Sequence, residues 1–360
     1  MFNVQLNSHI LKHPIIQGGM GVGVSMSKLA TAAINHGCMG VISAAQPGYK
    51  EDDFYTNNFQ ANIRALKQEI NITRHNTQHQ GVLAVNVMVA SKRYNDYIKE
   101  ISTMDIDAII SGAGLPLNLP ELVQNKELLL GVIVSSGKAA QLICKVWDTR
   151  YNRIPDFIVI EGDKAGGHLG FKIEELRANS TQTLDEILED VLQVTLPYKE
   201  KYNKAIPLFV AGGIVSGYEI AHYIKKGASG VQMGTAFLAT KECDAPLNFK
   251  QAVIDATIDD IGFTKSPSKL HGRALKTPFM MMVNQRHENI QVKRCVACLS
   301  MCNPSDTPYC ISQALIDSIN GNLDEGIVFV GESAARINAI VSVSDLVERL
   351  MKECISVYET

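Results

Sequence analysis

Eight short apolar runs recur along the first two thirds of the chain. They are rich in β-branched residues, and most of them end in glycine or in a small polar residue. The runs are continuous rather than alternating, which is typical of strands buried on both faces of a parallel sheet. They occupy residues 14–20, 38–45, 81–89, 107–114, 128–136, 156–162, 207–213 and 230–238.

Segments with helical spacing separate these runs. Residues 25–37 begin at Ser25, which we expect to be the N-cap, and residues 216–227 begin at Ser216 in the same way. Both segments close on a glycine, a common residue just past the end of a helix. Further helices are expected at 119–127, 137–150 and 183–202.

Eight strands in alternation with helices predict a (β/α)8 TIM barrel, an α/β architecture. An open doubly wound sheet is the alternative. The number of runs favours the closed barrel. The absence of a G-x-G-x-x-G fingerprint after the first run points the same way, because that fingerprint is typical of the dinucleotide-binding form of the open sheet.

The alternation of strands and helices breaks after about residue 240. We therefore divide the chain into a barrel at 1–240, a small additional domain inserted after the eighth strand at 241–325, and a C-terminal segment at 326–360. The last segment combines a short extended piece with helices, and we expect it to pack back on the barrel.

Composition and charge exclude several classes of partner. The chain has 360 residues, of which 46% are hydrophobic, enough for a large core. Its 34 Lys and Arg against 37 Asp and Glu give a net charge of −3 with no basic block, which argues against a nucleic-acid partner. No apolar run is long enough to cross a bilayer, and the N-terminus lacks the order of a secretory signal. We expect a cytoplasmic protein with no membrane or nucleic-acid partner.

A lone histidine stands among glycines directly after the run at 156–162, in the sequence AGGHLG. In a barrel, functional residues lie where the strands end. Imidazole is the side chain whose pKa lies nearest neutrality, and glycines let the backbone approach a ligand closely. We therefore take His168 as the candidate catalytic residue, with an incidental histidine in a tight turn as the alternative.

Two further strand ends are rich in glycine, at 211–214 and 233–237. The loops after the seventh and eighth strands of such barrels often hold a phosphate through backbone N–H groups. Close packing of strand against helix would also select glycine. The candidate phosphate ligands are Gly212, Gly213, Gly234 and Thr235.

A phosphate at this place suggests a mononucleotide cofactor, for which FMN is the natural candidate. Asn86 is a polar residue inside an apolar run, and the edge of a flavin would supply it with a hydrogen-bond partner. Lys138 could place a positive charge beside the flavin ring. The alternatives are a core asparagine bonded to backbone and a solvated lysine.

Taken together, these segments resemble the nitronate monooxygenase family, formerly called 2-nitropropane dioxygenases, and its relatives, the FMN-dependent enoyl-ACP reductases. The matching segments are PIIQGGMGVGVS, AVNVMV, AGGHLG, PLFVAGGI, GVQMGTAFLATKEC and SPSKLHGRALKTPF. The resemblance implies an FMN-binding barrel with an extra domain, and it assigns the catalytic role to His168. The FMN contacts that it implies are Gly18, Gly19, Met20, Gly21, Asn86, Lys138, Gly167, Ala211, Gly212, Gly213, Gly234 and Thr235.

The resemblance supports three functional hypotheses. The first is an FMN-dependent nitronate monooxygenase, which converts an alkyl nitronate and O₂ into a carbonyl compound and nitrite. The second is an NAD(P)H-dependent FMN reductase of enoyl thioesters or quinones, and the third is a non-catalytic flavin or electron-transfer subunit. The expected partner is a small-molecule substrate, and a homodimer is one option for assembly.

Four cysteines follow the barrel in the pattern C-x2-C-x3-C-x7-C, namely Cys295, Cys298, Cys302 and Cys310. Thiols at such short spacing are a metal-ligand pattern in a cytosolic protein, and their softness suits zinc or an iron–sulfur cluster. Some other FMN barrels carry a similar C-x2-C-x3-C run that binds [4Fe–4S]. We expect a metal site here, an iron–sulfur cluster ahead of zinc, with unliganded thiols as the alternative.

Other polar and sulfur-containing residues are assigned more simply. His271 and Arg273 follow the barrel in the segment SKLHGRALKTPF. They could line the substrate side of the flavin or lie in a surface turn. The other four cysteines are expected to act as packing residues, namely Cys38, Cys144, Cys243 and Cys354.

Overall fold

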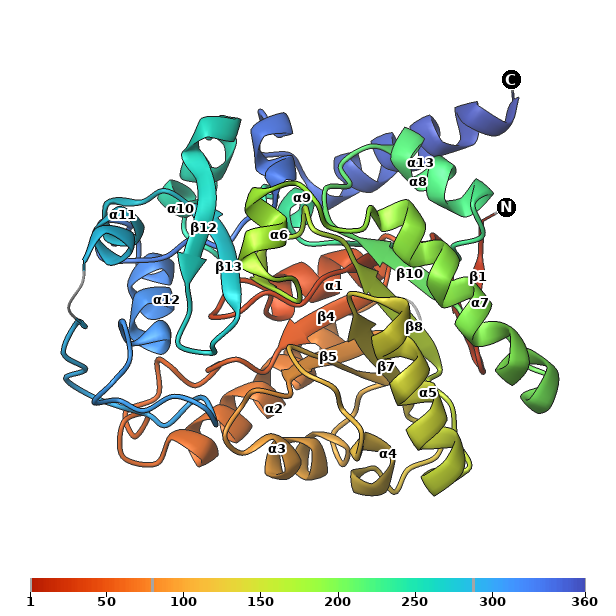
Figure 1. The fold of residues 1–360 in the computed structure, drawn as a ribbon, viewed down its shortest axis with the longest axis horizontal. Coiled ribbons are helices and arrows are strands. Elements are labelled where there is room, and N and C mark those ends of the chain that lie inside the picture. Colours follow the sequence, from red (N-terminus) through yellow and green to blue (C-terminus); the bar gives the residue numbers. More distant parts are fainter. Residues whose placement is uncertain (1, 79–80, 287–288, 360) are drawn as a thin grey trace.

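The computed structural model describes residues 2–78, 81–286 and 289–359. Its centre is a parallel sheet in the order β3-β11-β10-β8-β7-β6-β5-β4 (Figure 1). A parallel bridge between Ile16 and Met39 joins the first and last strands, where the Gln17 amide donates to the Met39 carbonyl at 2.9 Å. The strands are β3 (Ile15–Gln17), β4 (Gly40–Ser43), β5 (Leu83–Met88), β6 (Ala108–Gly112), β7 (Leu129–Val134), β8 (Phe157–Glu161), β10 (Leu208–Ala211) and β11 (Gly230–Met233).

The closed ring of strands confirms the predicted (β/α)8 barrel. All eight apolar runs contain a barrel strand, and the strands are buried because side chains pack on both of their faces. The inside of the barrel is filled by side chains such as Ile16, Ile110 and Phe157. A hairpin of β1 (Val4–Leu6) and β2 (His9–Leu11) adds Val4, Leu6 and Leu11 to the same cluster.

Helices cover the outside of the barrel, as predicted (Figure 1). Three of them, α2, α3 and α6, lie in segments for which no helix was predicted, and α9 lies in the final part of a predicted strand. The helices of the βα units are α1 (Ser27–Asn35), α2 (Asn58–Asn76), α3 (Tyr94–Ile101), α4 (Leu119–Leu122), α5 (Gly137–Tyr151), α6 (Ile173–Arg177), α7 (Leu184–Tyr202), α8 (Gly217–Lys225) and α9 (Thr235–Leu238).

The helix starts show one correct and one wrong prediction. Ser216 caps α8, since its side chain accepts from the Glu219 amide and the Glu219 side chain accepts from the Ser216 amide. Ser25 is not the N-cap of α1, because Met26 occupies that position. The Ser25 hydroxyl instead accepts a hydrogen bond from the Met20 amide at 2.8 Å.

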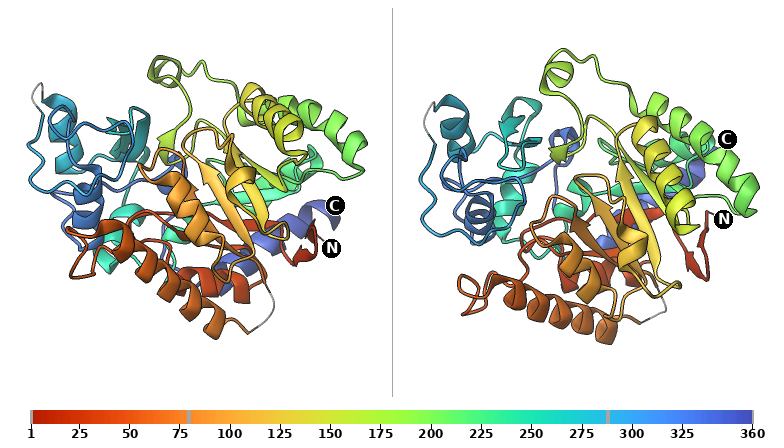
Figure 2. Two further views of the ribbon diagram at one scale, coloured as in Figure 1. Left: turned by 90° about the horizontal axis from the view of Figure 1, so that it is seen from below. Right: turned by 60° about the horizontal axis from the view of Figure 1, so that its bottom comes forward.

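The segment after the barrel is joined to the barrel through a shared sheet. Its hairpin, β12 (Ile261–Lys265) and β13 (His271–Leu275), forms a three-stranded sheet with β9 (Gly167–Leu169), which comes from the loop after β8. Figure 2 shows this region on one side of the barrel. Its helical elements are α10 (Leu247–Ile254), η1 (Ile258–Asp260), α11 (Pro278–Gln285) and α12 (Ile311–Ile319).

The C-terminal segment contains η2 (Glu332–Arg336) and α13 (Val343–Glu359). Helix α13 lies against α8, where Gly217 allows close contact: an added Cβ at Gly217 would be 1.9 Å from the Leu350 carbonyl oxygen. The Gly217 amide also donates to Glu353 at 2.7 Å. Within the described residues, no helix has the length and apolar character required to cross a membrane.

Candidate functional site

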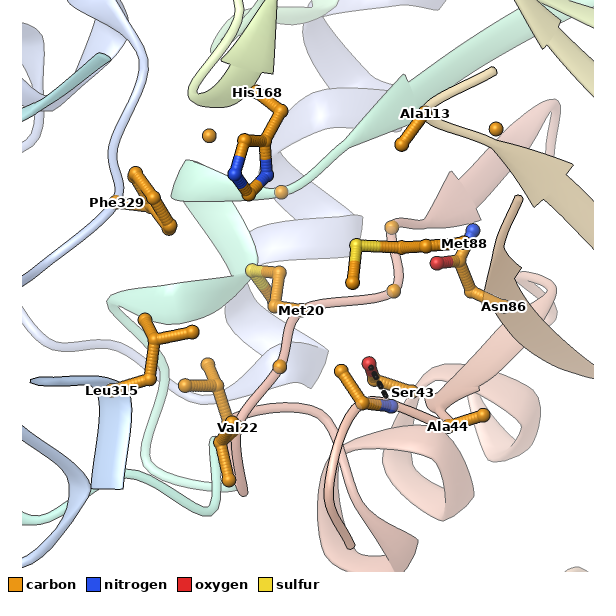
Figure 3. A pocket seen from close by; sticks show the side chains of 18 of the residues that line it. Met20, Val22, Ser43, Ala44, Asn86, Met88, Ala113, His168, Leu315 and Phe329 are labelled. Atoms are coloured by element: carbon orange, nitrogen blue, oxygen red, sulfur yellow. Dashed lines mark hydrogen bonds between the residues drawn. The ribbon is translucent and has the colours of Figure 1, made fainter. Parts of the chain in front are cut away.

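A cavity of about 610 Å³ lies where the barrel strands end. Its floor and one side come from the ends of β3, β4, β5, β8, β10 and β11, and its other side comes from the segment after the barrel (Figure 3). This is the end of a barrel at which functional residues gather, and the volume is typical of a pocket for a small molecule or cofactor.

The structure places eleven of the twelve expected FMN contacts on this cavity, together with His168. They are Gly18, Gly19, Met20, Gly21, Asn86, Gly167, Ala211, Gly212, Gly213, Gly234 and Thr235. The exception is Lys138, which is exposed at the start of α5 and does not line the cavity. The expected contact between Lys138 and a flavin therefore finds no support in its position.

The two glycine-rich strand ends form one concave part of the cavity. Gly212 and Gly213 have φ angles of +104° and +83°, a backbone region that favours glycine. An added Cβ at Gly234 would meet only the Met20 side chain, with Sδ at 3.5 Å, so this glycine leaves space open to the cavity. The short helix α9 begins at Thr235, whose hydroxyl accepts a hydrogen bond from the Gly331 amide at 3.0 Å. Backbone groups therefore predominate here, as in anion sites of this kind.

The loop after β3 packs directly against β5. A Cβ at Gly19 would lie 2.5 Å from the Asn86 Cβ, so only glycine allows this approach. The Asn86 amide nitrogen has one long contact, 3.4 Å to the Ile110 carbonyl oxygen. This weak contact leaves the side chain available to a ligand in the cavity.

Glu161 lines the cavity but is not among the candidates selected from the sequence. It is the last residue of β8, and it lies next to Ala211 in the barrel. Burial raises the pKa of its carboxyl to about 8. Loss of hydration is the one cause of this shift, with no hydrogen bond from a described residue to offset it. The sequence shows a glutamate at the end of an apolar run, which was the one signal for this residue. The environment of its carboxyl depends on the closure of the barrel and could not be predicted from that signal.

His168 lies on β9 and points into the cavity, with Phe329 beside it at a ring-centroid distance of 5.2 Å (Figure 3). Its Nε2 is 2.7 Å from the Ser266 hydroxyl, and that hydroxyl is 3.0 Å from the Ser268 hydroxyl. Burial lowers the pKa of His168 to about 4, so the imidazole is neutral at neutral pH. The lone histidine is therefore a cavity residue, and the surface-turn alternative is wrong.

The loop that carries His168 is held from two directions. Strand β9 pairs with β13, with His168 opposite Gly272. Arg273, only 3% exposed, donates to the carbonyls of Asp163 and Ala165, the second at 2.9 Å, and forms an ion pair of 2.8 Å with Glu332. Arg273 is thus a buried residue that holds the loop before His168 in place, and we call these interactions the Arg273 clamp. The sequence suggested the substrate side of the flavin or a surface turn, and neither position describes it.

An apolar wall faces the polar strand ends. Met20 and Val22 come from the loop after β3, Leu315 from α12 and Phe329 from the C-terminal segment (Figure 3). The wall joins the barrel to the later segment, so that a bound molecule would contact both.

The eight cysteines fall into two groups. Cys38, Cys144, Cys243 and Cys354 are buried, as expected for packing residues, whereas Cys295 is exposed and Cys298, Cys302 and Cys310 are partly exposed. Cys298 lines the cavity. Across the described ranges, no three His, Cys, Asp or Glu side chains are arranged closely enough to hold a metal ion.

Comparisons with known proteins agree with this architecture. The family model described as nitronate monooxygenase matches residues 4–353. A probable nitronate monooxygenase of Staphylococcus aureus (strain JH9) is 26% identical over 314 residues, which cover 78% of this chain and 80% of that protein.

Two solved structures share the fold. FabK from Thermotoga maritima has a TM-score of 0.72 at 23% identity and covers 97% of this chain and 94% of its own. The nitroalkane oxidase from Streptomyces ansochromogenes has a TM-score of 0.74 at 20% identity, with 97% of each chain covered. With nearly its whole length matched by the family model, the chain belongs to the nitronate monooxygenase family and is an oxidoreductase.

Proposed function

We propose that the protein is an FMN-dependent oxidoreductase that oxidises alkyl nitronates with O₂ to carbonyl compounds and nitrite. The observation that carries the proposal is a half-buried, neutral His168 directed into the same cavity as the glycine-rich strand ends. Membership of the nitronate monooxygenase family supports the same reaction.

The residues present fit FMN. Gly213, Gly234 and Thr235 would hold the phosphate, because they offer backbone groups and space without bulky side chains. Asn86, with its single long contact, would bind an edge of the flavin ring. When bound, FMN would supply the transfer of electrons between the nitronate and O₂.

His168 would act as the base toward a neutral nitroalkane. Since Nε2 is engaged by Ser266, the proton from the carbon beside the nitro group would pass to Nδ1. The tautomer that fits has its proton on Nε2 and donates to the Ser266 hydroxyl, which leaves the Nδ1 lone pair free. At neutral pH His168 is uncharged and offers no positive charge to a nitronate anion, so the base role is the one that this protonation state allows.

A second candidate is the reduction of an enoyl thioester or a quinone at the expense of NAD(P)H. The apolar wall favours it, since Met20, Val22, Leu315 and Phe329 provide more apolar surface than a short alkyl nitronate needs. In this reaction His168 would orient the carbonyl group of the substrate.

Anaerobic reduction of the bound flavin separates the two candidates. The FMN-loaded protein is mixed without oxygen with a primary alkyl nitronate, or with NADH or NADPH, and the loss of flavin absorbance is followed. Bleaching by the nitronate but not by the pyridine nucleotides is expected. Rapid bleaching by NADH or NADPH alone would establish the reductase instead.

The role of His168 is tested by comparing two substrates in His168→Ala. The variant should keep bound FMN but lose about 10²–10⁴-fold in kcat/KM for a neutral nitroalkane, the usual contribution of a general base. The loss for a preformed nitronate should be much smaller, because that substrate needs no deprotonation. Equal kcat/KM values for wild type and variant on the neutral nitroalkane would remove His168 from the mechanism.

A further inference from the structure

Gln46 is a buried cavity residue that has no role in the reaction proposed above. It lies in the loop between β4 and α2, lines the cavity and is 8% exposed. Its φ of +53° lies in the left-handed region, which few residues other than glycine adopt. Strained backbone of this kind is concentrated at binding and active sites, where the surrounding structure holds it in place. The backbone at Gln46 therefore indicates a functional side chain.

A chain of amide groups fixes the orientation of the Gln46 side chain. The Gly48 amide donates to the side-chain oxygen of the fully buried Asn62 at 2.9 Å. Asn62 must therefore present its side-chain nitrogen to its other neighbours, and this nitrogen donates to the Gln46 oxygen at 3.1 Å. Asn58 donates to the same oxygen at 2.8 Å. Because two donors hold the Gln46 oxygen, the Gln46 nitrogen points to the other side.

The Gln46 nitrogen is a hydrogen-bond donor that faces the cavity. Among residues 2–78, 81–286 and 289–359, none accepts a hydrogen bond from it. In the same part of the chain, the Thr31 hydroxyl is the one fully enclosed side-chain group without a partner, so the Gln46 nitrogen is not sealed in the core. Its open side is the cavity that Gln46 lines. An acceptor oxygen on a molecule in the cavity would complete its hydrogen bonding.

The surroundings of Gln46 suit an apolar chain that carries an acceptor. Phe59 and Tyr97 also line the cavity, and their rings meet edge to face at 4.9 Å. Asn62 donates to the Tyr97 oxygen at 2.8 Å, so the Tyr97 hydroxyl keeps its own hydrogen for donation. We define Gln46, Phe59 and Tyr97 as the tail subsite. It offers apolar rings beside hydrogen-bond donors.

The tail subsite lies across the cavity from His168. Gln46 follows β4, the loop with His168 follows β8, and these two strands are four apart in either direction around the ring. Figure 3 shows His168 on one side of the cavity and Ala44, two residues before Gln46, on the other, with Met20 and Met88 between them in this view. A substrate with its reacting carbon at His168 would extend its tail over apolar side chains toward Gln46.

We propose that Gln46 is a specificity-determining residue that donates a hydrogen bond to an acceptor oxygen on the tail of the substrate. The substrate class is a nitroalkane or nitronate whose alkyl chain carries a carbonyl or ester oxygen. The reacting group is the one given above, so this proposal rests on the proposed function. A site built to hydrogen-bond its substrate discriminates against an analogue that leaves the buried donor unpaired.

The first test compares substrates in the wild type. The ratio kcat/KM is measured for methyl esters of straight-chain ω-nitroalkanoic acids and for unsubstituted 1-nitroalkanes of the same overall length. At the tail length that reaches Gln46, the ester should be favoured about 3–10-fold, the contribution of a hydrogen bond between uncharged groups. The absence of a preference for the ester at every tail length would overturn the proposal.

Exchange of the donor for an acceptor tests Gln46 itself. Gln46→Glu keeps the oxygen that Asn58 and Asn62 contact and replaces the open N–H group with an oxygen. The preference for the ester should be lost, whereas an ω-nitro alcohol, which can also donate, should keep its advantage over the 1-nitroalkane. Gln60→Glu, the same change at an exposed glutamine of α2 outside the cavity, should keep the ester preference. An unchanged ester preference in folded Gln46→Glu would overturn the assignment.

Binding without turnover separates this proposal from the proposed function. Equilibrium dialysis of the FMN-loaded protein measures the Kd of a methyl alkanoate in which a methyl group replaces the nitro group. Gln46→Glu should raise this Kd about 3–10-fold, and Gln60→Glu should leave it unchanged. Weaker ester binding in Gln46→Glu, together with no oxidation of any nitroalkane by the wild type, would support the tail subsite and contradict the proposed function alone. Loss of FMN binding by folded Gln46→Glu would show that Gln46 contacts the cofactor instead, and would overturn the proposal.

Discussion

At the scale of single residues, burial shifts the pKa values of two titratable groups of the cavity, His168 and Glu161, in opposite directions. His168 has its pKa lowered to about 4, and Glu161 has its pKa raised to about 8. Both shifts have one cause, the loss of hydration of the charged form. At neutral pH the cavity therefore contains a neutral base and a largely neutral acid, which is an environment suited to proton transfer.

The low pKa of His168 predicts the acid limb of the pH profile. In the proposed mechanism His168 acts as a base only when neutral, so kcat/KM for a neutral nitroalkane should stay level as the pH falls from 7 to about 5, and fall only toward about 4. The profile is measured in Glu161→Gln, which removes the second titration, with circular dichroism to confirm that the protein is folded. Half-maximal activity near pH 6.5 would show that the pKa of His168 is not lowered, which would contradict this prediction.

The raised pKa of Glu161 predicts a pH-dependent stability. The folded state keeps its proton up to a pH of about 8, whereas the unfolded state loses it near 4.5. The contribution of the Glu161 carboxyl to the free energy of unfolding is thus fully present below pH 4.5 and is lost as the pH rises toward about 8. The melting temperature of the FMN-free wild type should decrease more between pH 5 and pH 8 than that of Glu161→Gln. Identical decreases would show that Glu161 ionises normally.

At the scale of elements, the position of His168 depends on a sheet built from distant segments. Strand β9 comes from the loop after the barrel strand β8, but its partner β13 and the Ser266 hydroxyl come from about 100 residues later in the chain. Arg273 on β13 then fixes the turn before His168 through the Asp163 and Ala165 carbonyls. The segment after the barrel therefore has a direct role in shaping the cavity.

Removal of the buried guanidinium tests this dependence. Arg273→Met should lower the free energy of unfolding by about 1–3 kcal/mol, because it leaves two buried carbonyls without their donor and the partly exposed Glu332 without its partner. Denaturant unfolding measures the change. The double variant Arg273→Met, Glu332→Gln removes the unpaired charge and should recover part of the loss. A loss below ~1 kcal/mol for the single variant would show that the clamp is not needed.

The contact between α8 and α13 gives a second prediction at this scale. Gly217→Ala should destabilise the protein by about 1–3 kcal/mol, since the added Cβ would meet the Leu350 carbonyl oxygen at 1.9 Å. Gly234→Ala is the matched control, because its Cβ meets no atom closer than 3.5 Å. Thermal unfolding of both variants checks this, and equal melting temperatures would mean that α13 is not packed as described.

At the scale of the whole molecule, the barrel could be predicted because each of its strands has a recognisable local sequence pattern. A continuous apolar run followed by glycine or a small polar residue occurs eight times, and all eight contain a strand of the ring. Local chemistry also identified the glycine-rich ends and His168, since few residue types suit those positions. The last run extended beyond its strand, because its final part, residues 235–238, forms α9 instead of continuing β11.

The features that were missed depend on contacts between distant parts of the chain. Nothing near Arg273 in the sequence specifies that it is buried against the loop before His168, and nothing near Glu161 specifies an enclosed carboxyl. Lys138 had a suitable charge and a suitable place at the start of a helix, yet it is exposed and away from the cavity. The pattern of apolar residues predicts where strands and helices lie. The direction in which a side chain points depends on how the barrel closes.

The most direct test of the central claim is a fluorescence titration of FMN into FMN-free protein, for the wild type and Gly234→Val. The wild type should bind one FMN per chain. The valine should weaken binding at least ~10-fold, because its side chain would occupy the part of the cavity beside Met20, where an added Cβ already lies 3.5 Å from the Met20 sulfur. No binding of FMN by folded wild type, or equal affinity in the two proteins, would contradict the placement of FMN in this cavity.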